Sequence, residues 1–347
     1  MYRPILSSSK RNLSKLLFTT SNYNAARSNL ISIRYMATST PLGVDTSIEN
    51  NLKTETNKLS KTLSKFWEKV EIINENDPKN GKHKLTITLD SKPIKTLLGN
   101  KLQVDTDREY LALMLLNEWS TLPSLKIKSH SLPLTSIVSR CIDLENALND
   151  LDLLNSDPEL AAKIGCKDRS TISNLLLRYL DTDTLLCFSP KKDLDGALRT
   201  EQDELYLPII KKIEQFLTPY GPEKASGEKE KVRLEILDAE VHGLRGNQQN
   251  ELTKKAATNF MNQLSLWDLV VFEKTVLTTK SFICGILLLK SNEFGVDMET
   301  IAKLSTLETI HQTARWGEVE DTHDVAKRDI RRNINAAAIV AYKEPNV

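Results

Sequence analysis

The sequence predicts an α+β protein in which a small antiparallel β domain precedes a larger all-α domain. Apolar residues alternate with threonines over residues 85–89, which is the period of a half-buried strand. Turn-forming residues then divide the chain into short apolar runs as far as residue 104. Beyond residue 106, apolar residues recur mainly at helical spacing, so the second domain is expected to be helical.

The predicted β elements are three short strands joined by turns. The first strand covers residues 85–89, and residues 90–93 (D-S-K-P) that follow have turn composition. A second strand is predicted over residues 94–98. The pair Gly99-Asn100 then turns the chain into a third strand over residues 101–104.

Helices follow the β elements. Thr106 and Glu109 have the spacing of a capping box, in which each side chain satisfies a backbone N–H of the other residue. The helix that they start is expected to run through Trp119. Residues 181–188 are expected to be extended. Further helices are predicted over residues 136–154, 169–179, 198–217, 250–264, 267–277, 281–290, 297–316 and 322–341.

Two of these helices have recognisable ends. Ser265, with Asp268 three residues later, is expected to cap the helix over residues 267–277. Asp297 begins another helix, and Gly317 ends it. That helix carries one predicted apolar stripe: Ile301, Leu304, Leu307, Ile310 and Ala314.

The charge distribution is uneven along the chain. The 347 residues include 47 basic and 46 acidic residues, a balance that argues against a protein that coats nucleic acid. The first 44 residues nevertheless contain six basic residues, many serines and no acid. This composition is typical of a mitochondrial presequence, which we predict over residues 1–35. Its removal would leave 41 basic and 46 acidic residues, a net charge of −5.

The remaining chain suits two domains behind a short lead-in. Residues 36–62 are polar and lack periodicity, so we expect them to form a flexible lead-in. A small β-rich domain is predicted over residues 63–132, and a helical domain over residues 133–347.

The sequence lacks the motifs that carry most catalytic and cofactor chemistry. It contains no G-x-G-x-x-G, Walker A, H-E-x-x-H or G-x-S-x-G pattern, and its four cysteines form no CxxC pair. Residues 318–324 are rich in acids but lack the Gly or Asn turns of loops that bind hard cations. We therefore expect no catalytic residue, no cofactor and no metal. The most apolar run, residues 281–289, is under half of the ~20 residues that a membrane-spanning helix needs, so no stable membrane insertion is expected.

Residues 316–324 (W-G-E-V-E-D-T-H-D) are the most distinctive stretch of the chain. In a structural interpretation, the acids lie in the first turn of a helix, where the macrodipole stabilises each by about 0.3–1 kcal/mol. In a functional interpretation, Trp316, Glu318, Glu320 and Asp321 form an exposed acidic hook that binds a basic or N–H-rich surface of a partner. The residue pattern by itself leaves both interpretations open.

Other conspicuous residues have ordinary structural interpretations. Trp67 and Trp119 are expected to lie in the core. Arg140 and Asp143 are one helical turn apart and are predicted to form a local ion pair.

Short motifs occur along the chain in a fixed order. They are Phe66-Trp67-Glu68-Lys69-Val70, Leu89-Asp90-Ser91-Lys92-Pro93-Ile94-Lys95-Thr96, Glu118-Trp119, Leu132-Pro133-Leu134-Thr135 with Asp143, Tyr179-Leu180-Asp181-Thr182-Asp183, Gln202 with Leu207-Pro208, Lys280-Ser281-Phe282 and Trp316-Gly317-Glu318. This ordered set resembles the assembly chaperones of the F-type ATP synthase catalytic sector that attend its alpha subunit (assembly factor 2 type). The resemblance covers about residues 66–341. The chain departs from it at Ser91, Leu97 and Tyr206, where the family usually has Gly, Pro and often Trp.

The resemblance implies a function for the whole chain. It implies a chaperone of the mitochondrial matrix that uses no nucleotide or metal and is not an enzyme. Such a chaperone holds the unassembled alpha subunit, prevents its aggregation and releases it when the beta subunit takes its place. The family's acidic position near the C-terminus falls on Glu318 or Glu320, and the motif does not decide which. We expect the chaperone to act as a monomer and to bind no nucleic acid.

Two other classes of function remain to be distinguished from this one. A structural subunit of a stable mitochondrial matrix complex is the main alternative, and it would migrate with its complex at fixed stoichiometry. A matrix enzyme with a cleft between its domains is the other, and no motif of the sequence supports it.

Overall fold

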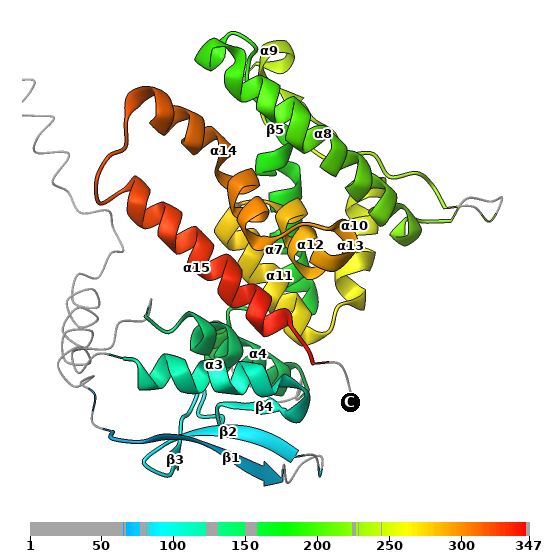
Figure 1. Ribbon diagram of the computed structural model, residues 1–347. Coiled ribbons are helices and arrows are strands. Elements are labelled where there is room, and N and C mark those ends of the chain that lie inside the picture. The colour runs from blue at the N-terminus through cyan, green and yellow to red at the C-terminus, as the bar shows by residue number, and fades with distance from the viewer. Residues whose placement is uncertain are drawn as a thin grey trace, which may run out of the picture. The chain divides into compact units, whose positions relative to one another are not determined.

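The computed structural model describes residues 65, 67–76, 81, 83–122, 131–149, 158–223, 227, 229–243 and 245–344. The predicted presequence and lead-in lie outside these residues, as does Phe66 of the first motif. The predicted α+β class is confirmed, because an antiparallel sheet is followed in the chain by a set of helices (Figure 1). The predicted domain boundary falls between residues 132 and 133, and the division into two domains stays a prediction.

The antiparallel sheet is built around strand β2 (His83–Leu89), which was predicted from its alternating pattern. Strand β1 (Val70–Asn76) pairs with the whole length of β2 on one side. Strands β3 (Lys92–Pro93) and β4 (Gln103–Asp105) share the other side. The sequence analysis missed β1, since every residue of this edge strand is at least partly exposed and no alternating face marks it.

The predicted strand over residues 94–98 is wrong. It is replaced by β3 and by an isolated bridge between Lys95 and Lys101, because the chain turns at residues 97–99. Leu97 lies on this turn and is almost fully exposed, so it contributes nothing to the core. Across the turn, the Leu102 N–H donates to the Ile94 carbonyl at 2.8 Å, and the Ile94 N–H donates to the Ile87 carbonyl of β2 at 3.0 Å.

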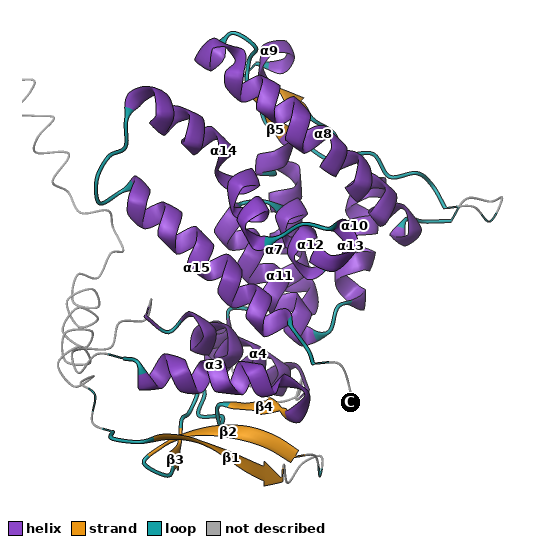
Figure 2. Ribbon diagram, viewed as in Figure 1, coloured by secondary structure: helices purple, strands orange, loops and turns teal. Residues whose placement is uncertain are grey.

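Helix α3 (Glu109–Ser120) packs on the sheet (Figure 2). Of the two predicted core tryptophans, Trp67 precedes β1 and Trp119 belongs to α3 itself. The rings of Trp67 and Trp119 meet edge to face at 5.4 Å between centroids, and both side chains are buried. The predicted capping box is wrong. Thr106 instead begins a 3-10 helix, η1 (Thr106–Arg108), and neither η1 nor α3 has a side-chain cap.

The helical part of the chain follows the predicted pattern except at α6 (Pro158–Ile164), which was not predicted, and residues 150–154 of the predicted helix over 136–154 lie outside the described residues. Its principal helices are α4 (Pro133–Asn149), α6 (Pro158–Ile164), α7 (Arg169–Asp181), α8 (Ala197–Leu217), α10 (Glu251–Gln263), α11 (Leu266–Thr279), α12 (Phe282–Leu289), α14 (Met298–Trp316) and α15 (His323–Ala341). Short helices α9 (Ala239–His242) and α13 (Ser291–Phe294) also occur. The prediction of extended chain over residues 181–188 holds only at strand β5 (Cys187–Phe188), which pairs in parallel with β6 (Leu237–Asp238). It is wrong for Asp181, which ends α7, and for the 3-10 helix η3 (Thr184–Leu186).

Two predicted helix starts are confirmed at the level of atoms. The Ser265 hydroxyl accepts a hydrogen bond from the Asp268 backbone N–H at 3.1 Å. The Asp297 carboxylate accepts one from the Thr300 N–H at 2.7 Å. Both caps satisfy backbone donors that the first turn of a helix leaves without partners.

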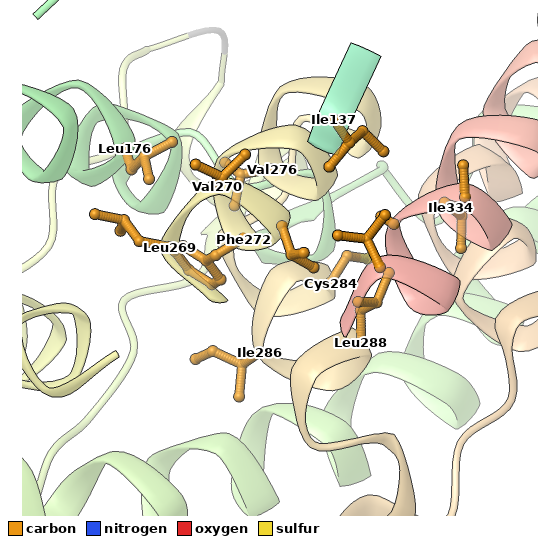
Figure 3. Packing of buried hydrophobic residues seen from close by; sticks show 14 of the residues in the cluster. Ile137, Leu176, Leu269, Val270, Phe272, Val276, Cys284, Ile286, Leu288 and Ile334 are labelled. Atoms are coloured by element: carbon orange, nitrogen blue, oxygen red, sulfur yellow. The ribbon is translucent and has the colours of Figure 1, made fainter. Parts of the chain in front are cut away.

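The core of the helical part lies around α11 and α12. Helix α12 is buried from Phe282 to Leu288, and α11 packs against α12, α15 and α4. Figure 3 shows Phe272 of α11, Cys284 of α12 and Ile334 of α15 among the buried side chains of this core. Among the described residues, the search for a helix both long enough and apolar enough to cross a membrane gave no candidate.

Candidate functional site

The end of α14 and the start of α15 project from the core as an exposed hairpin (Figure 1). Ile301, Leu304 and Leu307 of the predicted stripe are buried, but Ile310 is 38% exposed and Ala314 is exposed. The apolar stripe therefore reaches the core only along the first half of α14. We call residues 314–325 the tip; apart from His323, all of them are exposed.

Backbone contacts give the tip a defined conformation. Gly317 ends α14 with φ +88°, a value that favours glycine, and its N–H donates to the Thr313 carbonyl at 2.9 Å. The Val319 N–H donates to His323 Nδ1 at 2.9 Å, which closes the loop onto the first residue of α15. Asp321 also has a positive φ, of 61°, a conformation that Asp adopts more readily than most residues.

One anchor ties the tip to the rest of the chain. Arg315 Nη1 lies 2.5 Å from Asp195 Oδ2 of the 3-10 helix η4 (Asp193–Gly196). Both side chains are exposed, so this ion pair contributes little to stability, of order 0–1 kcal/mol. This ion pair restricts the position of the end of α14, and the acids of the loop take no part in it.

The three predicted site acids are not explained by helix capping. Because α15 begins at His323, Glu318, Glu320 and Asp321 precede the helix rather than occupy its first turn. The only acid in that first turn is Asp324. Within the described part of the chain, none of the three side chains makes a hydrogen bond or an ion pair. The structural interpretation of these acids is therefore wrong for all three.

Apolar side chains accompany the acids at the tip. Trp316 is 69% exposed, and Val319 and Val325 are each more than half exposed. Trp316 was predicted from the sequence but neither valine was, although Val319 stands between Glu318 and Glu320. An exposed tryptophan with flanking valines and free carboxylates can bind a partner surface that is apolar at its centre and basic at its rim.

The acids of the earlier motifs lie in quite different surroundings. Glu118 of α3 accepts the Leu134 and Thr135 backbone N–H groups at 2.8 and 2.9 Å, so it caps α4, and burial raises its pKa. Asp183 is fully buried and accepts the Ile283 N–H at 2.9 Å, which caps α12. Burial raises the pKa of Asp183 to about 6. These motif acids hold helices together rather than face a ligand.

Asp143 belongs to the same structural class. Its Oδ1 accepts the Thr96 hydroxyl at 2.5 Å and the Asn100 side-chain amide at 2.7 Å, so it fastens the β3–β4 loop to α4. The predicted ion pair with Arg140 is wrong. Arg140 instead reaches Glu273 of α11 at 3.3 Å, because a tertiary partner outcompetes the neighbour one turn away.

Neither the cysteines nor the acids form a metal centre or a reactive thiol within the described residues. No group of three or more His, Cys, Asp or Glu side chains there is arranged to hold a metal ion. Cys141, Cys166 and Cys284 are buried, and burial raises the pKa of each thiol, that of Cys284 to about 12. Buried, protonated thiols are poor nucleophiles.

The sequence and fold can now be compared with those of known proteins. Residues 64–214 match the model of a family described as the ATP12 chaperone protein. Over 318 residues the chain is 52% identical to the mitochondrial ATP12 protein of Saccharomyces cerevisiae, covering 89% of this chain and 93% of that one. The chain belongs to the ATP12 chaperone family. The resemblance found in its motifs is thereby confirmed.

A second curated relative and two solved structures are also similar to this chain. The mitochondrial atp12 protein of Schizosaccharomyces pombe is 31% identical over 255 residues, which cover 74% of this chain and 76% of that one. The crystal structure of Atp12 from Paracoccus denitrificans superimposes with a TM-score of 0.53 at 21% identity, covering 80% of this chain and 99% of that one. The structure of the Atu1473 protein of Agrobacterium tumefaciens superimposes with a TM-score of 0.57 at 18% identity, covering 80% of this chain and 85% of that one. These two structures establish the shared fold.

Proposed function

We propose that this ATP12-family chaperone binds the unassembled alpha subunit of the F-type ATP synthase catalytic sector in the mitochondrial matrix. It prevents the aggregation of that subunit and hands it on for assembly with beta subunits. The family membership supports a chaperone, and both curated relatives are named as mitochondrial proteins. The basic, acid-free N-terminal segment agrees with import into mitochondria.

The observation that carries the proposal is the tip. Trp316 at the end of α14 and the loop acids Glu318, Glu320 and Asp321 lie close together in the exposed tip, where the three acids have no partner among the described residues. Exposed tryptophan is costly to solubility, and surfaces of this kind mark interaction sites. We propose that these four residues contact the client.

The mechanism that we propose is competitive capping. An unassembled subunit exposes the apolar interface meant for its neighbours, and such surfaces aggregate. A chaperone that covers part of this interface must also release it, so a small contact with a polar rim suits the task better than a large apolar one. Exchange against the beta subunit then depends on the rate at which the chaperone dissociates.

The net charge of the chaperone fits a monomer that binds an aggregation-prone client. Removal of the predicted presequence leaves a net charge of −5, and like charge opposes self-association. We accordingly propose binding, and no catalysis, as its activity.

The proposal can be tested with residues 36–347 and purified alpha subunit. Light scattering of diluted alpha subunit should fall when equimolar chaperone is present. The variant Glu318→Lys/Glu320→Lys should lose this protection, because two attractive charges at the contact become repulsive. The matched control Glu204→Lys/Glu230→Lys makes the same charge change at two exposed acids elsewhere, and it should protect like the unmodified protein.

Two outcomes would overturn the proposal. One is unmodified chaperone that leaves the scattering of the alpha subunit unchanged. The other is a native sizing experiment on matrix extract in which the protein migrates only within a stable complex at fixed stoichiometry, as a structural subunit does. Urea unfolding of all variants separates lost binding from lost folding, since exposed substitutions usually change stability by within about 0.5 kcal/mol.

A further inference from the structure

Helix α3 carries apolar side chains on both of its faces. The buried face packs against the sheet through Leu111, Ala112, Leu115 and Trp119. On the opposite face, Tyr110 is 61% exposed, Leu113 48% and Met114 46%. Leu113 and Met114 follow Tyr110 by three and four residues, so both side chains are neighbours of the Tyr110 side chain on the helix surface.

The exposed face of α3 has the composition of a covered surface. Along α3, residues 110–117 include no charged residue. A solvated helix face normally carries charged or polar side chains, and a helix that is apolar all round is normally buried. Within the described part of the chain, packing therefore does not explain the solvent exposure of this stripe.

Contacts from the C-terminal end of α15 extend this surface and hold it in place. The ring of Tyr342 lies 6.4 Å from that of Tyr110 and is half exposed. The buried Arg108 guanidinium donates to the carbonyl oxygens of Val340 and Tyr342. Glu344 Oε1 accepts the Tyr110 backbone N–H at 2.7 Å. Because these contacts hold the segment after α15 against the start of α3 before any partner binds, binding there costs less conformational entropy.

We call Tyr110, Leu113, Met114 and Tyr342 the α3 patch. Four partly exposed side chains offer on the order of 300 Å², well below the roughly 800 Å² per partner of a standard stable interface. A dimer of this chain held by the α3 patch alone would therefore be unstable. The area suits one contact among several with a partner that is later released.

We propose that the α3 patch is a second contact for the client, and that it receives an uncharged apolar surface of the unassembled alpha subunit. This inference rests on the proposed function. The absence of charge along the α3 stripe matches an apolar subunit interface and not a basic one. Tyrosine and methionine are both enriched at interfaces, and methionine adapts its shape to the surface it meets.

The tip and the α3 patch lie at opposite ends of α15 (Figure 1). The 19 residues of this helix span about 28 Å at 1.5 Å per residue. A client surface that reaches both contacts is held by two modest interactions that reinforce each other through effective concentration. Loss of either one speeds release, which is what a chaperone that hands on its client requires.

The test is a measurement of affinity for the alpha subunit with Leu113→Gln/Met114→Gln. Glutamine has a helix propensity close to that of leucine and methionine, so α3 should remain intact. We expect affinity to fall at least tenfold. The matched control Leu175→Gln/Leu207→Gln changes two leucines of α7 and α8 that are 40% and 44% exposed. We expect the control to bind within twofold of the unmodified chaperone.

The possible outcomes separate this inference from the function on which it rests. If the unmodified chaperone binds the alpha subunit and Leu113→Gln/Met114→Gln binds equally well, the α3 patch is not a client contact. If the unmodified chaperone does not bind the alpha subunit, the proposed function itself fails. A sedimentation experiment in which the unmodified chaperone is dimeric and Leu113→Gln/Met114→Gln is monomeric would overturn the inference in favour of a second copy.

Discussion

Acidic residues lie near the starts of both α12 and α15, but their surroundings are opposite. Asp183 lies fully buried beside the start of α12 and accepts the Leu185 and Ile283 backbone N–H groups at 2.8 and 2.9 Å. Glu318 and Glu320 lie on an exposed loop before α15, where no described residue bonds their side chains. A motif acid therefore belongs either to the fold or to a binding surface, and burial with its hydrogen bonds decides which.

The largest effect is expected at the buried acid. Asp183→Ala removes the acceptor of two buried backbone N–H groups, each of which costs about 1–3 kcal/mol when left without a partner. We expect the free energy of unfolding to fall by about 3 kcal/mol, measured by urea denaturation at pH 7. Asp324→Ala at the exposed start of α15 is the control and should change it by under about 0.5 kcal/mol. Equal effects at the two positions would break the comparison.

Stability should also depend on pH through Asp183. Burial raises its pKa from 3.8 to about 6, so the folded state binds this proton more tightly than the unfolded state. The stability gained from this tighter proton binding is fully present below pH 3.8 and is lost as the pH rises through 6. The free energy of unfolding then falls by up to about 1.4 kcal/mol per pH unit, while the hydrogen bonds to the carboxylate remain.

Asp183→Asn isolates this pH dependence, since the amide keeps one acceptor oxygen and does not titrate. Between pH 4 and pH 7, urea denaturation should show the unmodified protein losing stability relative to Asp183→Asn. A constant difference between the two proteins over this range would mean that Asp183 does not titrate there.

Substitution of one glycine in buried α12 and one in the exposed tip compares the same two regions by the steric cost of an added Cβ. A Cβ at Gly285 of α12 would lie 2.5 Å from Phe272 Cε2, whose ring is held between those of Phe282 and Phe260. Gly285→Ala should therefore cost about 2–3 kcal/mol by overpacking. A Cβ at Gly317 meets nothing within 4 Å, but the positive φ makes Gly317→Ala cost about 1 kcal/mol.

Urea denaturation of both glycine variants tests this order. Gly285→Ala should lower the unfolding midpoint more than Gly317→Ala does. The reverse order would mean that the tip is packed more tightly than the core, contrary to its exposure.

Several features fixed by neighbours in the chain were predicted correctly from the sequence, although the capping box at Thr106 and Glu109 was not, and features fixed by distant partners were missed. The cap at Ser265 and the ends of α14 depend on residues three or four positions apart, so their patterns were decisive. The ion pair of Arg140 was mispredicted because its partner, Glu273, lies far along the chain. Strand β1 was missed because an edge strand need not alternate.

The candidate site divides in the same way. Trp316, Glu318, Glu320 and Asp321 lie within six consecutive positions of the sequence, so their clustering could be predicted from the chain alone. Sequence could not decide between a capping role and free carboxylates, since that depends on α15 beginning at His323 rather than earlier. The α3 patch was invisible for a related reason: an apolar helical stripe has the same pattern whether the fold covers it or leaves it exposed.

The central claim is that the exposed tip, and not the buried acids of the motifs, meets the client. Hydrogen exchange of residues 36–347, alone and in complex with the alpha subunit, tests it directly. We expect at least tenfold slower exchange of the backbone N–H groups over residues 317–322 in the complex, with no change in buried α12. Unchanged exchange over residues 317–322, together with slowed exchange on another surface, would contradict it.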